Sequence, residues 1–336
     1  MRWALSIGTA WVIFALYLDG FAHISEWVES FFTWYHLILY SGIFVPSAVL
    51  VLIGLGNLRR GFPLRRMLPR PYMLALLGSA IFLVGGFVDM GWRGVFGFEE
   101  DIEALLSPSH LFLAVGGLLI FNAPILEFLS IRPADRPKAK QSLLPVWIAW
   151  FGNLAFISFF TQYTTPFNHP NLFVGGRPFG EQFIWDIGLL SLVIWESVLL
   201  VSFMLLSLRY WKWPRGYFTV NLTLHALILW LSYWNTPVRQ YWLVLPGALL
   251  AGIIVDLVYS RLQPSYATQA ARVALRRFAF LIPFIVFSIY FAILVQAYGV
   301  WWQVHMWLGA PFTAGFIGWM LSLVAAPPAI TDNADG

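Results

Sequence analysis

A group of titratable residues interrupts the apolar N-terminal part of the chain, in the stretch DGFAHISEWVESFFTWYH that runs from residue 19 to residue 36. Asp19 and His23 are four residues apart, so on one helix their side chains point the same way. His36 begins the next apolar run and can face both across a hairpin. One carboxylate and two imidazoles hold a transition metal and leave coordination positions open, as oxygen or water activation requires. The spacing therefore predicts a metal site formed by Asp19, His23 and His36.

The chain has no cysteine, so any metal must be held by histidine and carboxylate side chains. These three ligands alone permit copper, zinc or iron. A purely structural role for these three residues is the alternative to a metal site. In it, Asp19 and His23 cap a helix at the membrane interface, and His36 forms a hydrogen bond to a neighbour.

A second stretch repeats the pattern of the first. Asp89 is followed four residues on by Arg93, and the strings ESFFTWYH and EALLSPSH, which end in His36 and His110, align without a gap. A duplicated hairpin is the simplest explanation. Arginine cannot ligate a metal because its guanidinium stays protonated. Asp89 and His110 are therefore weaker candidates for a second metal site, and the alternative is a relic in which Arg93 forms a salt bridge with Asp89 or Glu103.

Three other histidines lie in apolar surroundings. His305, near the outer end of the last apolar run, is a candidate further ligand for the second site, or an interfacial histidine among tryptophans. His169 is interpreted as a loop residue. Glu196 lies in the middle of an apolar run and needs a partner, for which His225 is the natural candidate. A hydrogen-bonded structural pair is the first interpretation, and a proton path is the alternative.

Two further acidic residues lie near the inner ends of apolar runs. Glu127 is predicted to be neutralised by Arg132, and Asp256 by Arg261, because each arginine follows within a few residues. Both acidic residues are interpreted as structural rather than functional.

The composition requires a membrane around these residues. The chain has 336 residues, of which 60% are hydrophobic and 11% charged, and its mean hydropathy is +0.74. Such a chain is a polytopic, all-α bundle of transmembrane helices. Apolar runs long enough to span a bilayer, about 20 residues each, cover residues 3–22, 33–55, 72–92, 109–130, 143–162, 183–208, 218–235, 241–260, 278–298 and 303–325. These ten spans predict five outward-pointing hairpins.

The charges predict the orientation of the spans. With both termini in the cytoplasm, 17 of the 20 Lys and Arg residues fall in inner segments. The acidic residues of the outer segments favour cations there; they are Asp19, Glu26, Glu29, Asp89, Glu99, Glu100, Asp101, Glu103 and Glu181. We expect an integral protein of a bacterial or archaeal cytoplasmic membrane, with the metal site on the periplasmic or external side. Nucleic acid is not expected as a partner, because the basic excess marks inner loops.

No polar linker divides the chain into soluble domains, so residues 1–336 are predicted to form a single integral membrane domain. Residues 1–130 carry the duplicated hairpins and residues 131–325 add further transmembrane helices. Residues 326–336 form a short polar tail.

The two motifs resemble those of the C subunit of the copper membrane monooxygenases, the family of ammonia monooxygenase and particulate methane monooxygenase. That family carries Asp, three residues, His, twelve residues, His, which corresponds to Asp19, His23 and His36. Phe32 and Thr33 in ESFFTWYH, and Tyr40, also match. In the second motif Asp89 and Arg93 stand where the family has asparagine and histidine, and three extra residues precede His110. The resemblance covers residues 15–115.

This resemblance implies a copper-binding subunit of a multi-subunit membrane complex that oxidises a small molecule with dioxygen at an outer-leaflet site. Its expected partners are the lipid bilayer, other membrane or periplasmic subunits and a small-molecule substrate. Two alternatives use the same residues differently. One is a non-catalytic copper or zinc carrier or assembly factor, and the other is a structural subunit of a membrane complex.

Overall fold

The computed structural model describes residues 1–25, 32–97, 101–131, 140–177 and 179–327. In these ranges the chain is helical and has no β-strand longer than an isolated bridge between Val174 and Val300. Nine of the described helices are long and apolar enough to cross a membrane. The prediction of an all-α, polytopic integral membrane protein is confirmed. The predicted roles of Glu26, Glu29, Glu99 and Glu100 fall outside the described residues.

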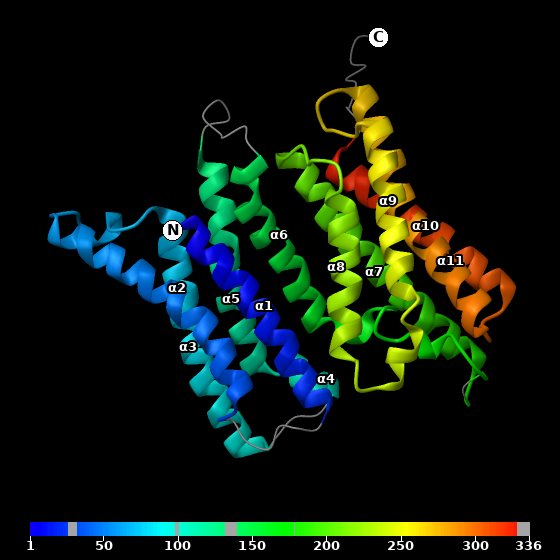
Figure 1. Cartoon of the computed structure of the whole chain (residues 1–336), viewed down its shortest axis with the longest axis horizontal. Coiled ribbons are helices and arrows are strands. Elements are labelled where there is room, and N and C mark those ends of the chain that lie inside the picture. Colours follow the sequence, from blue (N-terminus) through cyan, green and yellow to red (C-terminus); the bar gives the residue numbers. More distant parts are fainter. Residues whose placement is uncertain (26–31, 98–100, 132–139, 178, 328–336) are drawn as a thin grey trace, which may run out of the picture. The chain divides into compact units, whose positions relative to one another are not determined.

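The chain groups into two compact units, Met1–Thr161 and Gln162–Gly336. The first unit contains five long helices and one short helix (Figure 1), which are α1 (Arg2–Ile24), α2 (Trp34–Arg59), α3 (Arg70–Phe96), α4 (Asp101–Leu106), α5 (Pro108–Ser130) and α6 (Lys140–Phe160). Helix α1 pairs with α2, and α3 pairs with α5. These are the two hairpins that carry the repeated motifs.

The second unit contains the helices α7 (Gln182–Tyr210), α8 (Tyr217–Ser232), α9 (Val244–Leu262), α10 (Gln269–Ile293) and α11 (Val304–Ala325). Helix α10 continues through a π-helical turn, Leu294–Tyr298. The predicted span over residues 218–235 is wrong in length. It forms the 16-residue helix α8, which at about 1.5 Å per residue is shorter than the ~30 Å of a hydrocarbon core.

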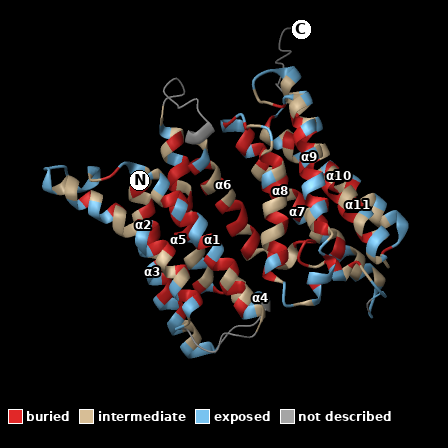
Figure 2. Ribbon diagram, viewed as in Figure 1, coloured by how far each residue is buried: buried red, intermediate tan, exposed pale blue. Residues whose placement is uncertain are grey.

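Burial differs strongly between the two helices that carry the first motif. Within its most apolar stretch, α1 is 61% buried and α2 is 28% buried, and Figure 2 shows the exposed residues distributed along α2. The exposed side chains of α2 are mostly large and apolar, among them Leu37, Phe44 and Leu52. In a bilayer this surface faces lipid or another apolar protein surface.

Close packing of α3 against α5 depends on glycine. A Cβ atom added at Gly78 of α3 would lie 2.7 Å from the Gly116 carbonyl oxygen of α5, and a Cβ at Gly116 would lie 2.7 Å from the Gly78 carbonyl oxygen. The two backbones therefore approach too closely for any other residue, as at small-residue contacts in other membrane bundles.

Gly78→Ala is expected to lower the free energy of unfolding by about 1–3 kcal/mol, because the added methyl group overpacks the α3–α5 contact. Gly91→Ala is the matched control, since it lies in the same helix with open space around its Cβ position. Denaturant titration in detergent micelles, followed by tryptophan fluorescence, measures both. Equal unfolding midpoints for the two variants would contradict the role assigned to Gly78.

Candidate metal centre

The three residues of the first motif come together at one end of the α1–α2 hairpin. Asp19 and His23 lie in the last two turns of α1, and His36 lies in the first turn of α2. Thr33 is the N-cap of α2, and its side-chain oxygen accepts a hydrogen bond from the His36 backbone N–H at 3.3 Å. This cap fixes where α2 begins, and therefore where the His36 side chain leaves the helix.

One carboxylate lies between two imidazoles in this cluster. Asp19 Oδ1 is 3.4 Å from His36 Nε2, and Asp19 Oδ2 is 3.8 Å from His23 Nε2. One ligand atom from each of the three side chains lies within 4.8 Å of the other two. Two ligand atoms at about 2.1 Å from one ion are at most about 4.2 Å apart, so side-chain movements of under about 1 Å would complete the contacts. Among the described residues, no other group of three such side chains meets this criterion.

The Asp19 carboxylate has an unused acceptor. Its Oδ1 atom is buried, and no donor in the described parts of the chain forms a hydrogen bond to it. The nearest imidazole nitrogen is His36 Nε2, at 3.4 Å. A buried carboxylate oxygen that accepts no hydrogen bond is costly. A cation bound between Asp19 and the imidazoles would remove that cost, so the donor set fits a metal ion.

The second hairpin has the same local construction. Ser107 caps α5, and its side-chain oxygen accepts a hydrogen bond from the His110 backbone N–H, as Thr33 does for His36. Asp89 lies near the end of α3, and its Oδ1 atom is 3.7 Å from His110 Nδ1. The shared caps give the two histidines the same position in the first turn of their helices.

A guanidinium holds the Asp89 carboxylate in this second cluster. Arg93 Nε is 3.2 Å from Asp89 Oδ2, and Arg93 Nη2 is 3.4 Å from His110 Nε2. Ser109 donates a hydrogen bond of 2.8 Å to Asp89 Oδ1, and Ser107 bonds to His110 Nδ1 at 2.7 Å. Arg93 therefore supplies positive charge where the first hairpin has His23. The two serines were not singled out in the sequence, although both lie in the string SPSH.

Tyr40 lies between the two hairpins. It extends from α2, and its ring packs edge to face on Phe82 of α3 at a centroid distance of 5.7 Å. Its hydroxyl occupies the space that a Cβ at Gly86 would need. Gly86 is one helical turn before Asp89, so Tyr40 connects the surroundings of the two clusters.

The other predicted ligands lie elsewhere. His305 is exposed in the first turn of α11 and belongs to the second unit. Its role as a ligand stays a prediction, as does a metal at Asp89 and His110. His169 packs edge to face on Tyr233 with ring centroids 5.5 Å apart. Burial lowers the pKa of His169, so at neutral pH its ring is uncharged.

The buried pair in the second unit is confirmed. His225 Nε2 on α8 lies 2.7 Å from Glu196 Oε1 on α7, and both side chains are 1% exposed. The Phe167 ring packs edge to face on the His225 ring. A hydrogen-bonded pair of this kind explains how a carboxyl group is tolerated in the middle of an apolar helix.

The acidic residues Asp256 and Glu127 have other partners than the arginines nearest in sequence. Asp256 of α9 accepts hydrogen bonds from the Thr219 backbone N–H at 2.8 Å and from the Thr219 hydroxyl, and it therefore caps the N-terminus of α8 in place of an ion pair with Arg261. Glu127 forms its ion pair with Arg2, while its predicted partner Arg132 is not described. Both contacts join residues far apart in the chain, which adjacency in sequence does not reveal.

In comparisons with known proteins, no protein-family model, no curated protein and no solved structure matches the chain.

Proposed function

We propose that this chain is a copper-binding integral membrane subunit in which Asp19, His23 and His36 hold one copper ion. The observation that carries the proposal is the convergence of these three side chains, with ligand atoms within 4.8 Å of one another around a buried carboxylate oxygen that lacks a hydrogen bond. A copper site also follows the divalent affinity order, in which imidazole and carboxylate ligands bind Cu²⁺ more tightly than Fe²⁺ or Zn²⁺.

The proposed activity is oxidation of a small molecule by dioxygen, as the resemblance to the copper membrane monooxygenases implies. Bound copper would supply the redox chemistry. The residues of the chain hold and orient the ion, and the surrounding helices limit the access of water. The distribution of Lys and Arg supports a site on the outer side of the membrane. A prokaryotic cytoplasmic membrane, with other membrane or periplasmic subunits as partners, is what the resemblance implies.

The second candidate function is a carrier or assembly factor that binds copper or zinc without turnover. The exposure of His23 favours it, since a ligand open to the surroundings permits exchange of the ion. A structural subunit, in which the same three side chains form only a polar network, is the third candidate.

Oxygen consumption separates these functions. The chain is purified from membranes together with its partner subunits, loaded with copper and supplied with reductant, dioxygen and small apolar or ammonia-like substrates. We expect consumption in the wild type and none above background in Asp19→Asn. Copper or zinc bound without oxygen consumption under any of these conditions supports the carrier, and a chain that binds neither metal leaves only the structural subunit.

Arg93→His tests whether the second hairpin is a former metal site in which the Arg93 guanidinium takes the place of the metal ion. Position 93 is four residues after Asp89, as His23 is after Asp19, and the Arg93 guanidinium already reaches both Asp89 and His110. We expect R93H to bind one copper ion per chain more than the wild type, as measured by elemental analysis. R93K is the control, because a charged ammonium offers no lone pair to a metal. Equal copper in R93H and R93K would contradict the prediction.

A further inference from the structure

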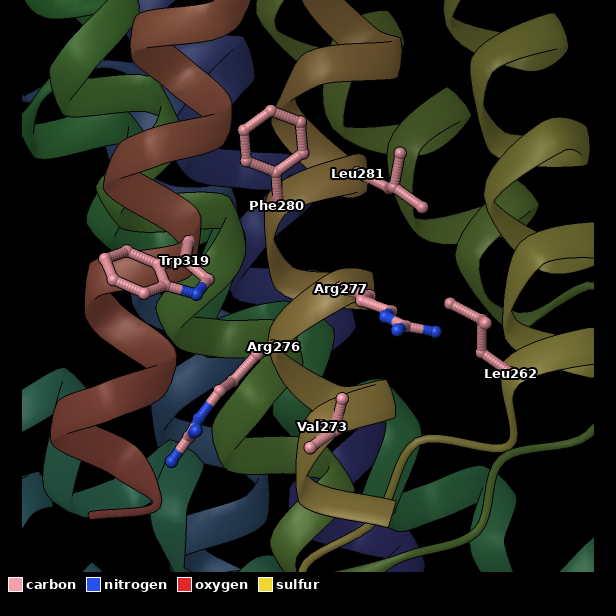
Figure 3. A pocket seen from close by; sticks show the side chains of 7 residues that line it. All are labelled: Leu262, Val273, Arg276, Arg277, Phe280, Leu281 and Trp319. Atoms are coloured by element: carbon pink, nitrogen blue, oxygen red, sulfur yellow. The ribbon is translucent and has the colours of Figure 1, made fainter. Parts of the chain in front are cut away.

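A pocket of about 510 Å³ lies in the second unit, along one face of α10. Its lining residues from α10 include Val273, Arg276, Arg277 and Phe280, whose spacing of three, four and seven residues places them on one helical face. Figure 3 shows Leu262, the last residue of α9, on one side of this face and Trp319 of α11 on the other. The volume is within the range of small-molecule sites, about 300–1,000 Å³.

The two arginines of the pocket lie between Val273 and the apolar pair Phe280 and Leu281 along α10. In Figure 3, Arg277 extends toward Leu262 and Arg276 extends on the opposite side of Val273, while Phe280 and Leu281 lie farther along α10. No Asp, Glu, Lys or Arg follows Arg277 until Asp332. The two arginines therefore mark the boundary at which α10 enters hydrocarbon, the depth where lipid phosphates lie.

The arginine charges lack partners. Neither Arg276 nor Arg277 forms an ion pair with the part of the chain that the structure describes. The Arg276 Nε atom is buried and has no hydrogen-bond partner there. A buried guanidinium N–H without an acceptor is costly, and a phosphate oxygen is the acceptor for which guanidinium geometry is best suited.

We propose that this pocket binds one anionic phospholipid. The phosphate lies beside Arg276, whose buried Nε has no acceptor, Arg277 adds positive charge one residue farther along α10, and an acyl chain follows Phe280, Leu281 and Trp319. Basic pockets between transmembrane helices bind anionic headgroups in this way. Trp319, which is 38% exposed, leaves apolar surface at which a chain can pack. The site is independent of the metal centre, since its residues all belong to the second unit.

Native mass spectrometry of the full chain, with equal amounts of phosphatidylglycerol and phosphatidylcholine, tests the proposal. Two arginines near the headgroup plane favour the anionic lipid by about 30-fold in bound ratio. We expect the R276Q/R277Q double variant to lose this preference. R59Q/R60Q is the matched control and is expected to keep it, because it removes two exposed arginines from the end of α2. An unchanged ratio in R276Q/R277Q would overturn the proposal.

Three further measurements separate a lipid from a free anion and from misfolding. Leu281→Trp fills the apolar part of the pocket with both arginines in place, and we expect it to reduce binding of phosphatidylglycerol. Inorganic phosphate is expected not to displace the lipid, and displacement would show a site for a free anion instead. R276K/R277K retains both charges and is expected to keep most of the preference for phosphatidylglycerol. If R276K/R277K has the native melting temperature but loses this preference, the result also counts against the proposal.

Discussion

His36→Ala is expected to lower the affinity of the purified chain for Cu²⁺ by at least about 100-fold. Loss of an outer-shell partner already costs 10–100-fold at metal sites, and His36 is proposed as a direct ligand. The alanine also leaves the buried Asp19 carboxylate with one imidazole in place of two. Copper per chain after dialysis against a competing chelator, measured by elemental analysis, gives the affinity.

His110→Ala is the matched control, because His110 occupies the same first-turn position of its helix as His36 and has a similar Ser/Thr cap. We expect H110A to retain the copper of the wild type, since Arg93 already neutralises Asp89 in that hairpin. Equal copper in wild type, H36A and H110A would mean that the first hairpin does not bind the ion. Equal losses in H36A and H110A would mean that the two hairpins act as one site.

The triad could be predicted from the sequence because all its contacts are local. Asp19 and His23 share one helix, and a single hairpin brings His36 back to them, so helical periodicity and the position of the turn are sufficient. The same reasoning placed Arg93 beside Asp89. The caps Thr33 and Ser107 also follow a sequence pattern. Each precedes its histidine by three residues, the spacing at which a Ser or Thr oxygen at the N-cap accepts a hydrogen bond from a backbone N–H in the first turn.

Contacts between distant segments could not be predicted in this way. Arg2 and Glu127 are 125 residues apart, and Asp256 reaches the start of α8 from another helix. Helices α1 and α5 pack side by side, which brings Arg2 to Glu127, and proximity in sequence does not reveal this packing. Hydropathy also overestimates the length of α8: its apolar run continues past Ser232, but the helix ends there with Tyr233 as its C-cap, before the 3₁₀ turn Pro237–Tyr241 begins. Apolar composition alone does not mark that change in backbone geometry.

The buried pair of Glu196 and His225 provides the largest expected change in stability. Glu196→Ala removes one partner and leaves His225, which is fully buried, without the acceptor that lies 2.7 Å from its Nε2 atom. Breaking a buried pair in this way costs about 3–5 kcal/mol. Glu196→Gln retains an acceptor oxygen of similar shape, so we expect it to cost about 1 kcal/mol. Both values are free energies of unfolding from denaturant titration in detergent micelles, and Glu181→Ala, an exposed glutamate before the same helix, is the control.

The double variant E196L/H225F decides whether the pair is needed for folding or retained for another purpose. Replacing both partners of a buried pair by apolar side chains of similar volume is often neutral or stabilising. We therefore expect the free energy of unfolding of the double variant to exceed that of E196A by at least about 2 kcal/mol. Additive effects of two destabilising substitutions would instead make the double variant less stable than E196A. A double variant as unstable as E196A would show that the two helices require the pair itself. A stable double variant would mean that a hydrogen-bonded carboxyl and imidazole within the membrane are not needed for the fold, and the proton path then becomes the explanation to test.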